Sequence, residues 1–145
     1  MRLTTRTNLA TRTLMLCAIS PDRLLRKHEV AVACDASENH LAQVIHLLGQ
    51  HGFLETRRGR GGGIRLGRPA QSITAGEVFR TFEAVLPFTE CSAGQTASTC
   101  TFAGNCRLTC VLNEALAAFY ARLDTVTLAD LVTGNKPLSV LLKVA

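Results

Sequence analysis

The chain has 145 residues, which is room for one domain or for a small domain with an appendage. Its 47% hydrophobic content and net charge of +5 fit a globular protein and exclude a disordered one. No apolar run is long enough to span a bilayer, and residues 14–19 are too short for a signal-peptide core. We therefore expect a cytoplasmic protein with no membrane partner.

The positive charge is concentrated in the first half of the chain. Residues 1–68 contain eleven lysines and arginines against five acidic residues, whereas residues 69–145 contain five against six. This asymmetry is expected if the first half meets a polyanion such as DNA. A solvated basic surface would give the same pattern, so charge alone leaves both interpretations open.

The first fifty residues predict a set of helices. Thr7 or Asn8 is suited to cap a first helix that runs to about Ile19. A short helix is predicted around residues 28–34, and Ser37 is suited to cap a longer one through about residue 51. Two helices joined by a tight turn are typical of a helix-turn-helix.

A β-hairpin is predicted next. Residues 53–58 and 64–66 alternate in polarity and flank the glycine-rich tip at residues 59–63, which follows Arg58 and contains Arg60. Glycines allow close approach to another surface, and arginines there suit phosphates or a narrow minor groove. A nucleotide-binding loop is the alternative, but these glycines lie between strands and no Gly-Lys-Ser/Thr follows. We therefore predict the wing of a winged helix.

The second half alternates helices with one long irregular segment. Helices are predicted at residues 74–83, 107–124 and 128–132, and residues 85–105 show no periodicity. Such a long loop is unusual in a small domain unless a function or a ligand orders it. The helix at 107–124 carries a continuous apolar stripe, which either pairs with a second copy in a dimer or is buried in its own chain.

Six cysteines in a cytoplasmic chain are unlike a structural disulfide framework. Cys17 and Cys34 lie in apolar stretches and fit small core residues. The remaining four crowd into twenty residues, with eight, five and three residues between successive members: Cys91, Cys100, Cys106 and Cys110.

The cysteine spacing favours an iron–sulfur cluster over a thiol redox switch, and both over zinc. Zinc sites usually pair their cysteines two to four residues apart, a pattern that is missing here. Iron–sulfur clusters favour thiolate ligands. Cys106 directly precedes the long helix, whose N-terminal dipole stabilises a thiolate, and Arg107 adds positive charge.

Four segments together resemble the family of winged-helix repressors that includes the NsrR, IscR and RirA regulators. They are the opening MRLTTRTNLA at 1–10, RGRGGGIRL at 58–66, GNCRL at 104–108 and TLADL at 127–131. The resemblance covers essentially the whole chain. The wing is common to members with and without a cluster, whereas the last two segments are most similar to the NsrR-type nitric-oxide sensors.

The resemblance implies a mainly α fold with a small β-hairpin wing: a winged helix-turn-helix followed by a long dimerisation helix. It implies a homodimer that binds a palindromic DNA operator and is not an enzyme. Arg58 would enter the minor groove and Arg60 would contact phosphate. The helix after Ser37 would enter the major groove, with these candidate DNA-binding residues: Ser37, Asn39, His40 and Gln43.

The resemblance also implies a cluster held by Cys91, Cys100 and Cys106, with [4Fe-4S] favoured over [2Fe-2S]. NsrR-type proteins take a fourth ligand from an aspartate in the partner's first helix, where this chain has Asn8. IscR-type proteins use a histidine where this chain has Thr109, and RirA-type proteins tend to have asparagine at the first-helix position. Asn8 of the partner, Cys110 and a non-protein ligand stay open as the fourth ligand.

The sequence thus predicts a repressor that loses DNA binding when nitric oxide nitrosylates its cluster. Iron or iron–sulfur status is the alternative signal, and a cluster-free thiol redox switch is a second alternative. The expected organisation is a DNA-binding domain at 1–84, a cluster-binding segment at 85–106, and a dimerisation helix with a C-terminal tail at 107–145. We call residues 85–106 the cysteine segment.

Overall fold

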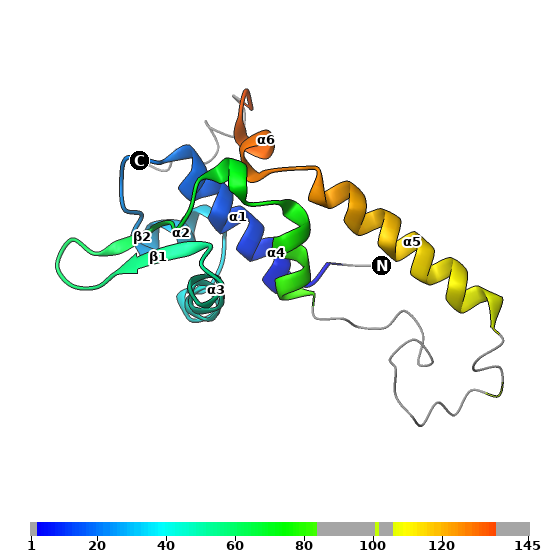
Figure 1. The fold of residues 1–145 in the computed structure, drawn as a ribbon. Helices are drawn as coiled ribbons and strands as arrows, with labels where there is room; N and C mark the ends of the chain where they lie inside the picture. The colour runs from blue at the N-terminus through cyan, green and yellow to red at the C-terminus, as the bar shows by residue number, and fades with distance from the viewer. Residues whose placement is uncertain (1–2, 84–100, 102–105, 136–145) are drawn as a thin grey trace.

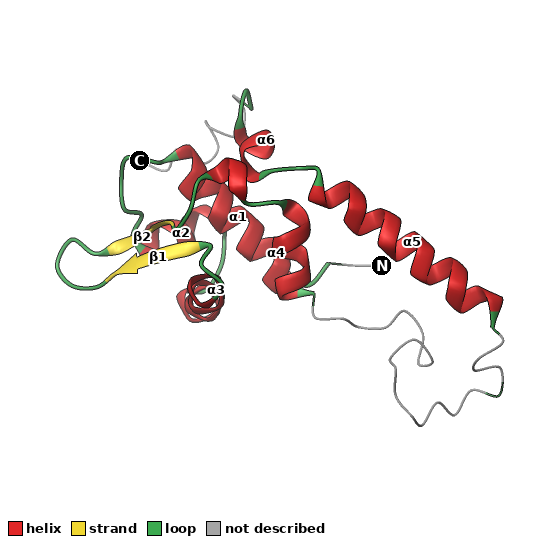
Figure 2. Cartoon of the chain, in the orientation of Figure 1, coloured by secondary structure: helices red, strands yellow, loops and turns green. Residues whose placement is uncertain are grey.

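The computed structural model describes residues 3–83, 101 and 106–135 (Figure 1). Helices dominate this part of the chain, and one antiparallel strand pair lies beside them (Figure 2). The predicted class, mainly α with a β-hairpin, is confirmed. The elements are α1 Thr5–Ile19, α2 Lys27–Ala33, α3 Glu38–Gln50, β1 Leu54–Arg57, β2 Gly63–Leu66, the 3-10 turn η1 Ala70–Ser72, α4 Ala75–Phe82, α5 Arg107–Asp124 and α6 Leu128–Val132.

Helix α1 runs through the middle of the head, by which we mean residues 3–83 (Figure 1). It contacts α3, α4, α6 and β2, and its inner face is buried, with Leu14 fully inaccessible. The helix begins earlier than the sequence predicted, because Thr4 is the N-cap and its hydroxyl accepts from the Thr7 N–H at 3.2 Å. The predicted caps Thr7 and Asn8 therefore lie inside the first turn.

Helices α2 and α3 form the predicted helix-turn-helix. Ser37 caps α3 as expected, with its Oγ accepting from the His40 N–H at 3.2 Å. The inner face of α3 is apolar and buried in the head core, where Leu41 and Leu48 have no exposed surface. Because this face is buried, the opposite face of α3 is the one exposed to solvent.

The hairpin pairs β1 with β2 in an antiparallel register from Leu54 opposite Leu66 to Arg57 opposite Gly63. Leu25 extends the sheet, since it exchanges two backbone hydrogen bonds of 2.9 Å with Ile64. Gly63 is required there, because a Cβ on it would lie 2.6 Å from the Leu25 carbonyl oxygen. The hairpin is thus attached to the segment that precedes α2.

Helix α4, at the end of the head, and helix α6, from the second half of the chain, both pack against α1. Thr74 caps α4, and Thr127, at the start of α6, forms a β-bridge with Thr74. Leu128 is buried in the same core as α1, so α6 returns to the head after α5. Among the described helices, none combines the length and the hydropathy that a membrane span requires.

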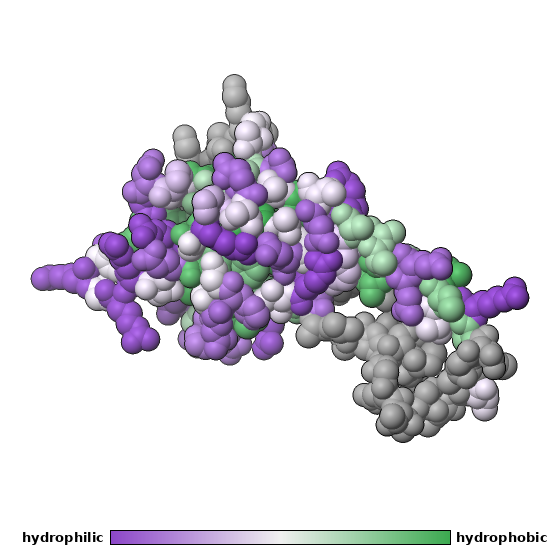
Figure 3. Space-filling model, in the orientation of Figure 1, coloured by the Kyte–Doolittle hydropathy of each residue, from purple (hydrophilic) through white to green (hydrophobic). Residues whose placement is uncertain are grey.

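Helix α5 projects away from the head and is held at its C-terminal end (Figure 1). Arg80 of α4 donates to both carboxylate oxygens of Asp124, at 2.6 and 2.8 Å, and its guanidinium lies 4.4 Å from the ring centroid of Tyr120. The apolar stripe of α5 has no fully buried member, and Leu108 and Val111 are about 60% exposed. Apolar side chains along α5 are visible in Figure 3.

Candidate nucleic-acid interface and cysteine site

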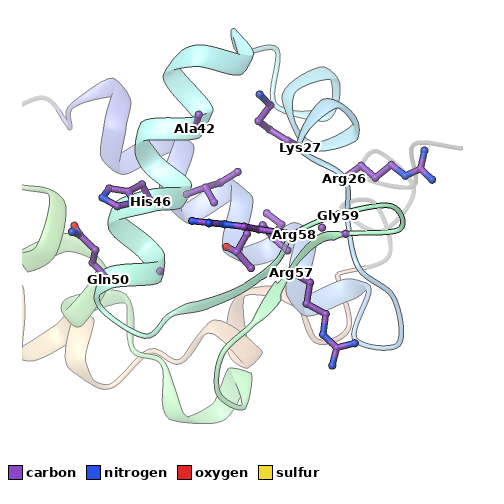
Figure 4. A pocket seen from close by; sticks show the side chains of 14 residues that line it. Arg26, Lys27, Ala42, His46, Gln50, Arg57, Arg58 and Gly59 are labelled. Carbon is purple, nitrogen blue, oxygen red and sulfur yellow. The ribbon is translucent and has the colours of Figure 1, made fainter.

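A groove of about 700 Å³ separates α3 from the hairpin (Figure 4). Three parts of the head form it: the outer face of α3, the wing, and the N-terminal end of α2. Half of its described lining residues are basic or polar, and the others are glycines and apolar residues that include Ile45 and Ile64. The polar side chains are Arg26, Lys27, His46, Gln50, Thr56, Arg57 and Arg58. Such a surface suits a polyanion.

The two consecutive arginines of the hairpin point in different directions. In Figure 4, Arg58 extends across the groove toward α3, whereas Arg57 points away from it. Arg57 is the last residue of β1 and Arg58 directly follows it, and successive side chains along extended backbone lie on opposite faces. Arg58 is therefore the hairpin arginine placed beside the outer face of α3.

Ion pairing divides the hairpin arginines into two groups. Glu55 accepts two bonds from Arg65, at 2.9 and 2.6 Å, and lies 3.7 Å from Arg57. The hydrogen bonds from Arg65 hold the pKa of Glu55 below its usual value, so Glu55 stays charged at neutral pH. Within the described residues, Arg58 and Arg60 have no such acidic partner, and their charge is available to a ligand.

The candidate residues of α3 lie at the start of that helix. Asn39 and Gln43 are exposed, and His40 is half-buried. Ser37 is exposed, but its hydroxyl is engaged in the cap. None of these four is among the described residues that line the groove, which meets α3 further along, at Ala42, His46 and Gln50.

Sequence reasoning missed Arg26, Lys27 and Gln50 in the groove. Arg26 and Lys27 come from the start of α2, and the available signal was two adjacent cations directly before a helix. Lys27 pairs with Glu38 at 3.0 Å, as does His28. Gln50 lies one helical turn after His46, so the spacing of four residues was its signal.

The described cysteines fall into two environments. Cys17 and Cys34 are buried, as predicted; burial raises the pKa of both thiols, to about 12 for Cys17. Cys106 occupies the N-cap position of α5 and is partly exposed. Cys110, one helical turn later, is exposed.

The remaining candidate ligands are only partly described. Asn8 is exposed on the first turn of α1. Cys91 and Cys100 lie outside the described residues, and among the described ones no group of three potential metal ligands comes together. Cys106 alone of the three predicted cluster cysteines is therefore described, and its partly exposed position at a helix N-terminus suits a thiolate ligand.

A helix-turn-helix followed by a hairpin with unpaired arginines is the architecture of a winged-helix DNA-binding protein. Residues 3–134 match the model of the Rrf2 family, described as an iron-dependent transcriptional regulator. The chain belongs to the Rrf2 family. It is therefore a DNA-binding transcriptional regulator and not an enzyme.

Curated relatives are similar over nearly the full length. The chain is 43% identical over 144 residues to the HTH-type transcriptional regulator NsrR of Bacillus subtilis (strain 168), covering 99% of this chain and 98% of that protein. It is 40% identical over 144 residues to the NsrR of Halalkalibacterium halodurans, with the same coverage. These likenesses support a transcriptional repressor.

Solved structures share the fold at lower identity. T. potens IscR matches with a TM-score of 0.70 at 22% identity, covering 91% of this chain and 86% of that one. Staphylococcus aureus CymR matches with a TM-score of 0.71 at 21% identity, covering 90% and 97%. The winged-helix fold is thus confirmed.

Replacing Arg58 by alanine is expected to weaken DNA binding by about tenfold, because Arg58 reaches into the groove without an acidic partner. Arg65→Ala is the matched control from the same hairpin; its guanidinium is held by Glu55, so we expect a change of about twofold or less. Fluorescence anisotropy with operator DNA at fixed salt measures both. Equal losses in the two variants would contradict the assignment of Arg58.

Proposed function

We propose that the protein is a homodimeric repressor that binds a palindromic operator and senses nitric oxide through an iron–sulfur cluster. The observation that carries this proposal is the 43% identity, over 144 residues, to the NsrR of Bacillus subtilis. The partly exposed Cys106 at the start of α5 supports it, because thiolates are the preferred ligands of such clusters.

The DNA-binding part of the proposal assigns the first half of the chain, residues 1–84, to the operator. The start of α3 would enter the major groove, where Asn39, His40 and Gln43 are suited to contact base edges. Ser37 would keep its role as the cap and contact phosphate from the same position. Arg58 would enter the minor groove, and Arg60 would contact phosphate. Glu55 pairs with Arg65 and Arg57, so the charges of Arg58 and Arg60 stay unpaired within the described residues, which supports both assignments.

The cluster part assigns Cys91, Cys100 and Cys106 as ligands within the cysteine segment. When bound, the cluster would supply irons to which nitric oxide can bind. Cys106 would hold its place through the first turn of α5, whose dipole favours the thiolate. For the fourth ligand, Asn8 of a second copy and Cys110 are both exposed and available, as is a non-protein ligand. The resemblance favours [4Fe-4S] over [2Fe-2S].

The dimer part assigns residues 107–145 to association, chiefly through α5. The apolar stripe of α5 has no fully buried member in the described chain, and it would be stabilised if a second copy covered it. Leu108 and Val111 are the most exposed large apolar side chains on α5. Two heads joined in this way would meet two half-sites of a palindrome.

Iron or iron–sulfur status is the second candidate signal. The observation that favours it is the description of the matching family as iron-dependent. The fold, the DNA contacts and the three cysteines would be the same under either signal. A cluster-free thiol switch is the third candidate, supported by the partly exposed Cys106 at the N-cap of α5 and the exposed Cys110 one turn later.

Replacing Cys106 by alanine is expected to abolish iron and sulfide binding, because a cluster ligated by three cysteines is not retained by two. Cys34→Ala is the control, since Cys34 is buried in the head core and should leave the cluster content unchanged. Iron and acid-labile sulfide are measured per chain after anaerobic purification. A Cys106→Ala variant with wild-type iron and sulfide would exclude this residue as a ligand.

The double variant Leu108→Asp, Val111→Asp is expected to halve the molar mass in solution, because two charges on the stripe would have to be desolvated in a dimer. Asn113→Asp adds a charge to the same helix away from these two side chains and should leave the mass at that of a dimer. Light scattering after size exclusion measures both. An unchanged mass in the double variant would place the dimer contact elsewhere.

A further inference from the structure

Three helices of the described chain complete their N-termini with an acid from their own first turn. The carboxylates of Glu29 in α2, Glu77 in α4 and Asp130 in α6 accept from the N–H of the residue that caps each helix, at 2.7, 3.1 and 2.8 Å. This reciprocal arrangement is the capping box. Helix α1 has no acidic residue in its first turn, and Thr7 occupies the corresponding position.

The carboxylate that completes the cap of α1 comes from Glu83, at the far end of the head sequence. The Thr4 N–H donates to Glu83 Oε1 at 2.7 Å, and the Thr7 hydroxyl donates to the same oxygen. Thr7 has no exposed surface, so this hydrogen bond is sheltered from water. The cap of α1 is therefore made from two parts of the chain that lie 79 residues apart.

The charge of Glu83 suits this position. Partial burial raises the pKa of its carboxyl, but the hydrogen bonds from Thr7 and Thr4 outweigh that effect, and the pKa lies below its ordinary value. The charged form also faces the positive end of the α1 dipole, which has no acid of its own to balance it. Glu83 is thus both a hydrogen-bond acceptor and the negative charge for this helix end.

Glu83 lies at the end of the head, just before the cysteine segment. Glu83 is the C-cap of α4, and the cysteine segment begins two residues after it. Thr7 directly precedes Asn8, and α1 contacts α3, which belongs to the helix-turn-helix. We propose that Glu83 is a positioning residue that ties the start of α1 to the origin of the cysteine segment, and so couples that segment to the DNA-binding head.

The inference has two halves: that Glu83 caps α1 (the capping half), and that this contact couples the cysteine segment to the head (the coupling half). The coupling half rests on the proposed function, because it requires a cluster-dependent change in the cysteine segment. A displacement of Glu83 would remove the acceptor from the Thr4 N–H and the Thr7 hydroxyl together, and the first turn of α1 would lose its cap. The capping half depends only on the described contacts. The two halves can therefore be tested separately.

Amide hydrogen exchange in the full-length, cluster-free protein tests the capping half. In Glu83→Ala the Thr4 amide is expected to exchange about tenfold faster, since a hydrogen bond to a charged group is lost. Glu83→Gln should lie between this variant and the wild type, because its amide oxygen still accepts. The matched control Glu77→Ala should accelerate exchange at Thr74 and leave Thr4 unchanged. An unchanged Thr4 rate in Glu83→Ala would overturn the inference.

Operator affinity tests the coupling half. It is measured with and without the cluster for the wild type, Glu83→Ala and Glu77→Ala, all prepared anaerobically. The ratio compared is the operator affinity with the cluster divided by the affinity without it. We expect this ratio to fall at least threefold in Glu83→Ala and to stay at the wild-type value in Glu77→Ala, although each variant loses a helix cap. Faster exchange at Thr4 with an unchanged ratio would overturn the coupling and leave Glu83 a structural cap.

Failure of the proposed function gives a different result from failure of this inference. If the wild type binds no cluster, or binds the operator equally well with and without it, the proposed function fails, and with it the coupling. The Thr4 exchange rates still decide whether Glu83 caps α1. If the wild-type ratio is large and Glu83→Ala leaves it intact, only the coupling fails.

Discussion

Burial of α1 is the packing interaction on which the rest of the head depends. Leu14 and Cys17 are almost completely buried, and the helix contacts α3, α4, α6 and β2. The recognition helix, the wing and the helix that leads to the cysteine segment are therefore all positioned against one element. Protein interiors are close-packed, so a shift of α1 would be felt by each of them. The proposed control of DNA binding would therefore act through this single helix.

Acidic residues decide which cations of the head are available to DNA. Glu55 holds Arg65 and lies near Arg57, and Glu38 holds Lys27 and His28. The Arg58 side chain is left to cross the groove beside α3, as Figure 4 shows. Exposed ion pairs add little to stability, so their main effect here is on the distribution of charge. Under the proposed function, the unpaired cations would contact the operator.

The fold was largely predictable because its signals are local. Ser37, the glycine-rich tip and the apolar stripe of residues 107–124 are patterns that a short window contains, and the structure has each element in place. The start of α1 was predicted too late, since Thr4 rather than Thr7 or Asn8 is the N-cap. The contact of Thr4 with Glu83 could not be predicted, because no local pattern links residues so far apart. The groove beside Arg58 also depends on tertiary packing. The ligand roles of Cys91, Cys100 and Cys106 stay predictions from spacing and resemblance.

The central claim is that nitric oxide acts on a bound cluster to release DNA. The most direct measurement is a titration of anaerobically purified protein with nitric oxide, in which the visible absorbance and the operator-bound fraction are followed in one sample. The account predicts that a broad absorbance is lost in proportion to added nitric oxide, with a parallel loss of operator binding. A coloured protein that keeps both its absorbance and its operator would contradict nitric oxide as the signal. A colourless protein without iron or sulfide would contradict the cluster itself.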